Sequence, residues 1–278
     1  MVRASRCSSS TTSTRTASAC PTVRSARDPA LNVLSAIPWQ SRGMLSIPPA
    51  QKESATTKRS PRLPDHLLPG VLVTAALAAA LLVLTCVVVW YDGPAGPDSA
   101  WLQWFIEHRT ETWTGLAKAI SAAGDTTSVA IYSILACAVL AWKRYWAQAV
   151  LIAVAALGAG ALTYFGKLLI GRDRPPVIDH LVIETNHSYP SGHALGSTVV
   201  AGMLVAVAVP EWQRLGKIAT IAIATIFVLA VGLSRLYLGV HWATDVLAGW
   251  LAGACWLSAC LTLRPAIYGA TARRLSAT

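Results

Sequence analysis

Residues 70–91 read GVLVTAALAAALLVLTCVVVWY, a run of 22 positions that holds no charged side chain. A helix of about 20 apolar residues is long enough to cross the hydrocarbon layer of a membrane. This stretch therefore predicts a transmembrane helix, and it sets the frame for the rest of the chain.

The remainder of the 278-residue chain repeats the pattern, with 54% apolar and 13% charged residues overall. Aromatic residues stand at the ends of the apolar runs, as in Trp142, Tyr145 and Trp146, which is typical of membrane interfaces. We predict an all-α polytopic membrane protein with six transmembrane helices. Five further spans follow residues 70–91, at about 127–142, 147–166, 194–209, 218–233 and 246–263.

Basic residues in the short connections predict the orientation of these spans. They lie before the first span and after the second, fourth and sixth, which places them all on one side with both termini. That side should be cytoplasmic, so residues 92–126, 167–193 and 234–245 should face outward. The basic residues are Lys52, Lys58, Arg59, Arg62, Lys143, Arg144, Arg214, Lys217, Arg264, Arg273 and Arg274.

Residues 101–120, WLQWFIEHRTETWTGLAKAI, place apolar side chains among charges at roughly helical spacing. This pattern predicts one interfacial helix on the outer face, after the first span. We expect it to pack and anchor the protein, with a lipid-entry gate as the alternative.

The chain divides into three parts on composition. Residues 1–65 are rich in Ser, Thr and Arg, which predicts a disordered tail. The alternatives are that this segment is an organellar transit peptide, or that the protein truly begins at Met44. Residues 66–264 form the membrane domain and residues 265–278 a short cytoplasmic tail. The net charge of +10 comes largely from the first part, so we predict no nucleic-acid partner, and the cysteines have no metal-binding or disulfide spacing.

Three polar clusters fall on the predicted outer face. In KLLIGRDRP, Lys167 and Arg174 are seven residues apart, so on a helix they would share a face, before Pro175 and Pro176 end it. Taken alone, such a pair is often a span end whose cations reach for the membrane surface.

The second cluster is YPSGHA, directly ahead of the fourth span. Ser191 is a natural N-cap and Gly192 lets the backbone approach a ligand, so free N–H groups would face an anion beside His193. The plainer alternative is a capped helix with an interfacial histidine.

The third cluster is SRLYLGVHWATD, in which Ser234 and Arg235 close the fifth span. His241 and Asp245 are four residues apart and would meet across one helical turn. A carboxylate that holds one ring N–H leaves the other ring nitrogen free to attack. The alternative is a buried His–Asp contact that only fastens two helices.

Together the clusters offer three cations, a hydroxyl, a helix start and two histidines, which is what phosphoryl transfer requires without a metal. We therefore predict no metal and no other cofactor. A metal site in the loop between the first two clusters is not favoured, because its candidate ligands match no familiar spacing. Those candidates are Asp179, His180, Glu184 and His187.

These motifs, K-x6-R-P, P-S-G-H and S-R-x5-H-x3-D, resemble the three-part signature of the type 2 phosphatidic acid phosphatase (PAP2) superfamily over about residues 67–263. The resemblance implies a Mg²⁺-independent six-helix membrane phosphatase that uses a phosphohistidine intermediate. It implies His241 as the nucleophile, Asp245 as its orienting group and His193 as the acid and base. It further implies a set of phosphate-binding residues, namely Lys167, Arg174, Ser191, Gly192 and Arg235.

The expected substrate is a lipid phosphate or diphosphate, because all three clusters lie where a lipid headgroup meets water. Polyprenyl diphosphate, phosphatidic acid and phosphatidylglycerol phosphate all fit, and we favour a polyprenyl carrier in a bacterial plasma membrane, with the site on the extracytoplasmic face. A lipid phosphotransferase and a catalytically silent membrane scaffold are the alternative functions. The sequence makes no prediction about oligomeric state.

Overall fold

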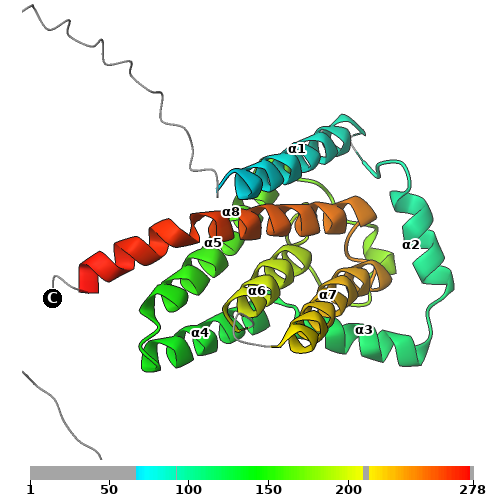
Figure 1. Ribbon diagram of the computed structural model, residues 1–278. Helices are drawn as coiled ribbons and strands as arrows, with labels where there is room; N and C mark the ends of the chain where they lie inside the picture. The colour runs from blue at the N-terminus through cyan, green and yellow to red at the C-terminus, as the bar shows by residue number, and fades with distance from the viewer. Residues whose placement is uncertain (1–66, 92, 209–212, 276–278) are drawn as a thin grey trace, which may run out of the picture. The chain divides into compact units, whose positions relative to one another are not determined.

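The computed structural model describes residues 67–91, 93–208 and 213–275, and all regular structure in these ranges is helical (Figure 1). The all-α prediction is therefore confirmed for the described part of the chain. The predicted tail at residues 1–65 lies outside it. The elements are α1 (Leu68–Tyr91), α2 (Asp98–Glu107), α3 (Glu111–Ala123), α4 (Thr126–Trp142), α5 (Trp146–Ile170), the 3-10 turn η1 (Val177–Asp179), α6 (Gly192–Ala208), α7 (Arg214–Tyr237) and α8 (Ala243–Leu275).

Each of the six predicted spans coincides with a helix, namely α1, α4, α5, α6, α7 and α8. Four helices are long and apolar enough to cross a membrane alone: α1, α5, α7 and residues 243–269 of α8. A fifth crossing is available if α3 and α4, which meet at a bend of 45°, count as one broken span. Helix α6 is apolar but only 17 residues long, so six crossings remain a prediction.

Helix α8 forms the centre of the bundle and packs against α1, α5 and α6. The core between these helices interleaves small and large side chains, which allows close helix approach. Ala155 and Ala159 of α5 face Leu195 and Val199 of α6, and all four are almost completely buried. This packing fixes where the first turns of α6 and α8 lie relative to the end of α5.

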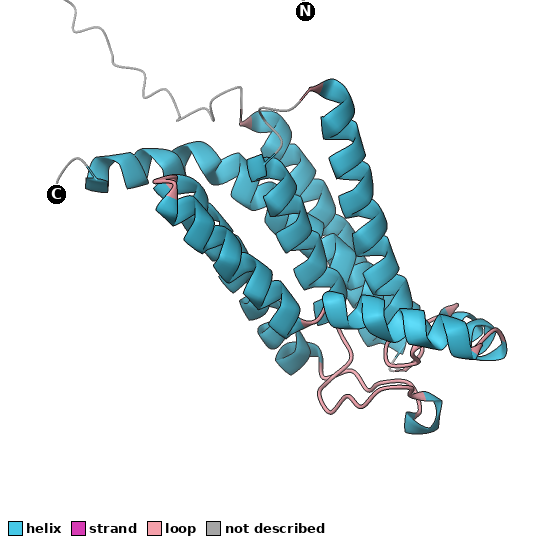
Figure 2. Cartoon of the chain, turned by 90° about the horizontal axis from the view of Figure 1, so that it is seen from below, coloured by secondary structure: helices cyan, strands magenta, loops and turns pink. Residues whose placement is uncertain are grey.

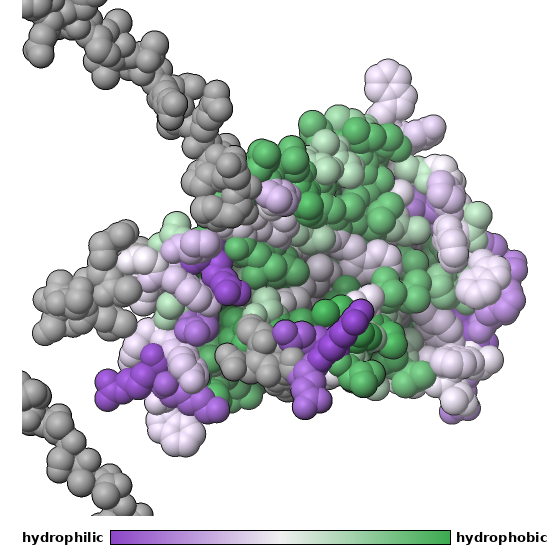
Figure 3. Space-filling model, in the orientation of Figure 1, coloured by the Kyte–Doolittle hydropathy of each residue, from purple (hydrophilic) through white to green (hydrophobic). Residues whose placement is uncertain are grey.

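Large apolar side chains also cover the outside of the helices. On α1, Leu72 is 60% exposed and Val83 is 64% exposed, and Val88 is the buried residue of the helix. Apolar residues dominate the surface over α1 in the space-filling view (Figure 3). Apolar surface on this scale is stable in contact with lipid, not with water, which agrees with an integral membrane protein.

The prediction of one helix over residues 101–120 is wrong, because the structure has two helices, α2 and α3, with a break at residues 108–110. The end of α7 holds this break. The Arg109 guanidinium donates to the carbonyl oxygen of Tyr237 at 3.1 and 3.0 Å, and the Thr110 N–H donates to the Tyr237 hydroxyl at 2.9 Å. Thr110 then caps α3 by accepting from the N–H of Trp113 at 3.3 Å. These long-range contacts override the local helical pattern.

Much of the loop backbone gathers at one end of the long helices, where Figure 2 shows the long connection between α5 and α6. The ends of α5 and α7 and the starts of α6 and α8 meet these loops. All three sequence clusters belong to this end of the bundle.

Candidate active site

The first cluster does not form a continuous helix. Helix α5 ends at Ile170, and Gly171 follows in the left-handed conformation, with φ of 63° and its N–H bonded to the Lys167 carbonyl at 3.0 Å. Glycine adopts this conformation without steric cost, so it stops the helix three residues before Arg174. The predicted shared helical face of Lys167 and Arg174 is therefore wrong.

Lys167 and Arg174 nevertheless converge, because both bind the loop that follows. The side-chain oxygen of Asn186 accepts from Lys167 Nζ at 3.0 Å and from Arg174 Nη2 at 2.6 Å. Arg174 also donates from Nη1 to the Val240 carbonyl at 2.5 Å, which joins it to the third cluster. Two cations are thus held close together at the end of α5.

Arg235 adds the third cation from the last turn of α7. Its buried guanidinium donates to Ser121 Oγ of α3 at 2.6 Å and forms an ion pair with Glu184. The second oxygen of Glu184 lies 3.4 Å from Arg174 Nη2. One carboxylate therefore lies between two of the three cations, so an anion is already accommodated at this place.

The third cluster brings His241 and Asp245 together, although His241 lies before α8 and not within it. His241 Nδ1 is 3.5 Å from Asp245 Oδ2, which is long for a hydrogen bond. Ser188 bridges the pair: its hydroxyl donates to Asp245 and lies 3.4 Å from His241 Nδ1. The other ring nitrogen, Nε2, is 3.3 Å from Arg174 Nη1 and faces the cations.

The surroundings favour the neutral form of the His241 ring. Burial lowers its pKa well below the usual 6.5, and the positive charges of Arg174, Arg235 and Lys167 lower it further. Burial also lowers the pKa of Arg174, with Glu184 acting in the opposite direction. A neutral imidazole beside three cations has a lone pair available for attack on an anionic substrate.

The second cluster begins α6 and touches the start of α8. The Ser191 N–H donates to the Asp245 carbonyl at 3.0 Å. Ser191 precedes the first helical residue, Gly192, but its buried hydroxyl has no partner in the described part of the chain. A Cβ on Gly192 would lie 2.8 Å from Thr163 Cγ2, so this glycine is required for close packing on α5. His193 lies in the first turn of α6.

Several residues of this region were not singled out by the sequence analysis. Asn186 and Ser188 belong to the loop before P-S-G-H, and Ser121 belongs to α3. Their residue types are common in exposed loops and helices, so no spacing marks them. Arg172 lies inside the first motif, where its charge was the one available signal.

Two of the four candidate metal ligands of the loop have other side-chain partners. His180 Nε2 bonds to the Pro175 carbonyl at 2.9 Å, and Glu184 pairs with arginines. Within the described ranges, no group of three or more His, Cys, Asp or Glu residues is arranged to hold a metal ion.

Fold and site together define an integral membrane protein of helical bundle type that carries a cluster of cationic side chains and histidines at one end. Residues 144–268 match the family model of the PAP2 superfamily. The resemblance drawn from the three motifs is thereby confirmed.

Two curated relatives match over shorter stretches. An undecaprenyl-diphosphatase of Sulfolobus acidocaldarius is 42% identical over 74 residues, which cover 27% of this chain and 32% of that protein. Phosphatidylglycerophosphatase B of Bacillus subtilis is 38% identical over 89 residues, or 31% of this chain and 43% of that protein. The matched segments thus span less than half of either relative.

Two solved structures share the fold. The transmembrane PAP2 type phosphatidylglycerolphosphate phosphatase from Bacillus subtilis superposes with a TM-score of 0.63 at 24% identity, covering 70% of this chain and 97% of that one. LpxE of Aquifex aeolicus superposes with a TM-score of 0.50 at 18% identity, covering 60% and 95%. The helical arrangement therefore extends beyond the segment that the family model matches.

Proposed function

We propose that this protein is a membrane phosphatase that hydrolyses a lipid phosphate or diphosphate. The observation that carries the proposal is the convergence of Lys167, Arg174 and Arg235 beside His241 Nε2. Two buried polar atoms in this region, Ser191 Oγ and Arg235 Nε, have no partner in the part of the chain that the structure describes. Buried polar atoms normally have partners, so phosphate oxygens are their natural ligands.

In the proposed reaction, His241 Nε2 attacks phosphorus while Asp245 and Ser188 hold the Nδ1 side of the ring. The bond from phosphorus to the leaving oxygen breaks, and His193 gives that oxygen a proton. Water then attacks phosphorus and gives its proton to His193, the bond between phosphorus and His241 Nε2 breaks, and inorganic phosphate leaves. The cations stabilise the charge on the equatorial oxygens throughout, so no step requires a metal ion.

The proposed topology has six crossings, with the site and both short helices α2 and α3 at the outer interface. Helices α4 and α6 are the shortest spans, with 17 residues each, and α6 is about 25 Å long for a rise of 1.5 Å per residue. It packs against α4, α5, α7 and α8, so protein covers most of it and its ends need not reach both lipid surfaces. Exposed Trp101, Trp104 and Trp113 on α2 and α3 suit an interfacial position. The N- and C-termini would then be cytoplasmic.

For the substrate we favour a polyprenyl diphosphate on the outer face of a bacterial plasma membrane, with phosphatidic acid and phosphatidylglycerol phosphate as alternatives. Support comes from the relatives, of which one is an undecaprenyl-diphosphatase and another a phosphatidylglycerophosphatase. All these substrates present an anionic headgroup on an apolar anchor, which suits a cationic site at the end of an apolar bundle.

The test is a phosphate-release assay with the purified protein in lipid nanodiscs, over these three lipids, with and without EDTA and vanadate. We expect release that survives EDTA, is inhibited by vanadate and is abolished in His241→Ala. His108→Ala, which removes an exposed histidine of the α2–α3 break, is the matched control and should keep full activity.

Two results would contradict the proposal. Turnover in His241→Ala at the wild-type rate would remove the nucleophile, and binding of lipid phosphates without any phosphate release would favour a silent scaffold. Transfer of phosphate to an added alcohol instead of water would identify a phosphotransferase on the same residues.

A further inference from the structure

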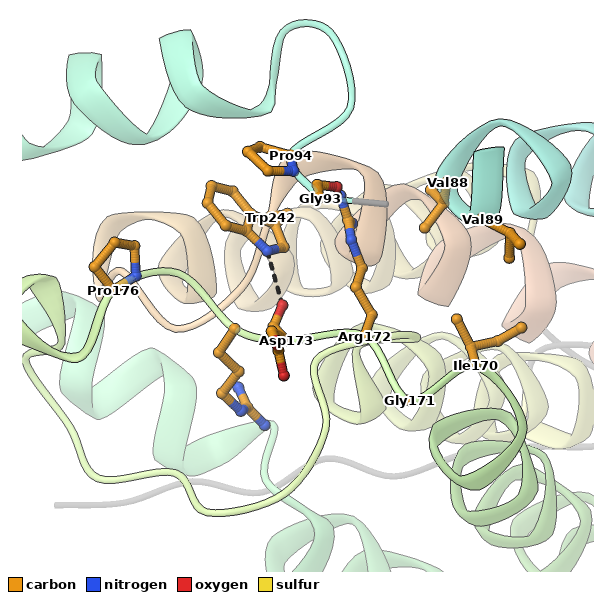
Figure 4. A pocket seen from close by; sticks show the side chains of 11 residues that line it. Val88, Val89, Gly93, Pro94, Ile170, Gly171, Arg172, Asp173, Pro176 and Trp242 are labelled. Atoms are coloured by element: carbon orange, nitrogen blue, oxygen red, sulfur yellow. Dashed lines mark hydrogen bonds between the residues drawn. The ribbon is translucent and has the colours of Figure 1, made fainter. Parts of the chain in front are cut away.

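Arg172 lies two residues before the arginine of the first motif and plays a different role in the structure. Its side chain is buried and points away from the cations, between two carboxylates. Arg172 Nη1 donates to Asp245 Oδ1 at 2.6 Å, and Nη2 donates to Asp98 Oδ2 at 2.8 Å. In Figure 4 this side chain extends towards Gly93 of the α1–α2 linker, and Nη2 donates to the Gly93 carbonyl at 2.8 Å.

Asp98 begins α2 and is completely buried. Its carboxylate accepts four hydrogen bonds, one of which comes from Arg172. The Thr244 N–H donates to it at 2.9 Å, the Thr244 hydroxyl at 2.7 Å and the Ala95 N–H at 3.0 Å. Thr244 precedes Asp245, so Asp98 holds the backbone of the catalytic segment as well as the arginine.

These groups form a line of alternating charges that ends at the reacting ring: Asp98, Arg172, Asp245, His241. Two carboxylates and one guanidinium leave one net negative charge while the ring is neutral. The charge is balanced when the ring becomes cationic, as it does on bonding to phosphorus. Buried charges are stable only when they are paired, so this line favours the phosphorylated ring.

We propose that Asp98 and Arg172 are positioning residues of the reaction, which orient Asp245 and supply the charge that offsets the phosphorylated His241 ring. The inference rests on the proposed function and extends it to a residue of α2 that no motif includes. Removing the hydrogen-bond partner of a metal-ligating side chain typically costs about 10- to 100-fold in activity, and we expect a loss of the same order when Asp98 or Arg172 is removed.

The pH dependence tests this role, because His241 faces charges of both signs. Lys167, Arg174 and Arg235 disfavour a cationic ring, and His193 adds to them when it is protonated, whereas Asp245 and Glu184 favour it. Removing the negative charge of Asp98 makes a cationic His241 ring less favourable, so it should move the acid limb of the kcat/KM profile to lower pH. Removing its positive charge should move that limb to higher pH.

The experiment compares Asp98→Asn, Arg172→Gln and Arg172→Lys with the wild type in the nanodisc assay. We expect kcat/KM to fall about 10- to 100-fold in Asp98→Asn and at least as far in Arg172→Gln, with KM changed less than threefold. The acid limbs of these two variants should move in opposite directions. Arg172→Lys keeps the positive charge but cannot donate to both carboxylates as the guanidinium does. It should therefore be more active than Arg172→Gln, and its acid limb should stay at the wild-type pH.

Glu107→Gln is the matched control, since it removes an exposed carboxylate from the other end of α2 and should behave like the wild type. Vanadate affinity within twofold of the wild type would show that the variants keep a folded site. Activity of Asp98→Asn equal to that of Glu107→Gln, or acid limbs that move in the same direction, would overturn the inference. If His241→Ala itself turned over at the wild-type rate, the proposed function would fail instead.

Discussion

Gly192 offers a test of how the second cluster is brought to the site. Replacing it with Ala would place a Cβ 2.8 Å from Thr163 Cγ2 of α5, well inside ordinary van der Waals contact. Thr163 cannot turn away freely, because its hydroxyl donates to the Ala159 carbonyl at 2.9 Å. The clash should push the first turn of α6 outward by up to about 1 Å, at an overpacking cost of about 1–3 kcal/mol.

A displacement of about 1 Å at a catalytic centre lowers rates by about 100-fold. We expect that loss of kcat/KM in Gly192→Ala, measured by phosphate release. Helix propensity acts the other way, since Ala is favoured over Gly by about 1 kcal/mol in a helix. Any loss therefore comes from the contact with α5 and not from a weaker helix.

The second variant, Thr163→Ser, removes the clashing methyl group and leaves Oγ1, which lies 3.8 Å from the added Cβ. The double variant should regain activity to within about tenfold of Thr163→Ser alone, as expected for residues that are directly coupled. A double variant as inactive as Gly192→Ala would refute the packing argument. It would indicate instead that the ligand approaches the Gly192 backbone too closely for any side chain.

Three further predictions concern pH, packing and the third cation. Because burial and neighbouring cations lower the pKa of His241, the acid limb of the kcat/KM profile should lie below pH 6.5. The same shift means that the contribution of His241 to folding stability is complete above pH 6.5 and falls at lower pH. An acid limb above pH 6.5 would contradict the buried position of the ring. Gly158→Ala should lower the thermal unfolding temperature in detergent, at a cost of about 1–3 kcal/mol, because the new Cβ would clash with the Trp256 ring. That ring is held by its hydrogen bond to the Ala155 carbonyl at 2.9 Å. An unchanged unfolding temperature would show that the ring can move. Arg235→Lys should raise KM and lower kcat/KM about 10- to 100-fold. A single ammonium group cannot replace the guanidinium hydrogen bonds to Ser121, Glu184 and phosphate, which are worth about 1.5–3 kcal/mol each. Kinetics equal to those of the wild type would remove Arg235 from the site.

The sequence predicted the helices well because membrane spans have a strong local signature. A long apolar run with aromatic ends must form a helix in lipid, where no water satisfies the backbone. Each predicted span is a helix in the structure, with ends that differ by a few residues, except that α8 continues to Leu275, twelve residues beyond the predicted end of the last span. The resemblance to the PAP2 superfamily was also predicted correctly, because fixed spacings such as P-S-G-H can be recognised along the chain, and residues 144–268 match the model of that family.

Local patterns failed at two places. The apolar spacing of residues 101–120 suggested one helix, but Tyr237 of α7 binds the backbone at Thr110 and divides it, and no local spacing marks this distant contact. The spacing of Lys167 and Arg174 suggested a shared helical face, but Gly171 ends α5 between them. Glycine is a common helix-ending residue, so this second break had a local signal that the spacing argument did not use.

By itself the sequence determined that this chain is helical, that it belongs in a membrane and which protein family its motifs resemble, because each of these depends on residue type and short spacing. Only the tertiary structure decided how the motifs meet. It showed that Ser188 joins His241 to Asp245, that Glu184 lies between two arginines, and that Arg172 links Asp245 to Asp98. Such contacts join positions up to 74 residues apart, so they depend on helix packing that no local spacing records.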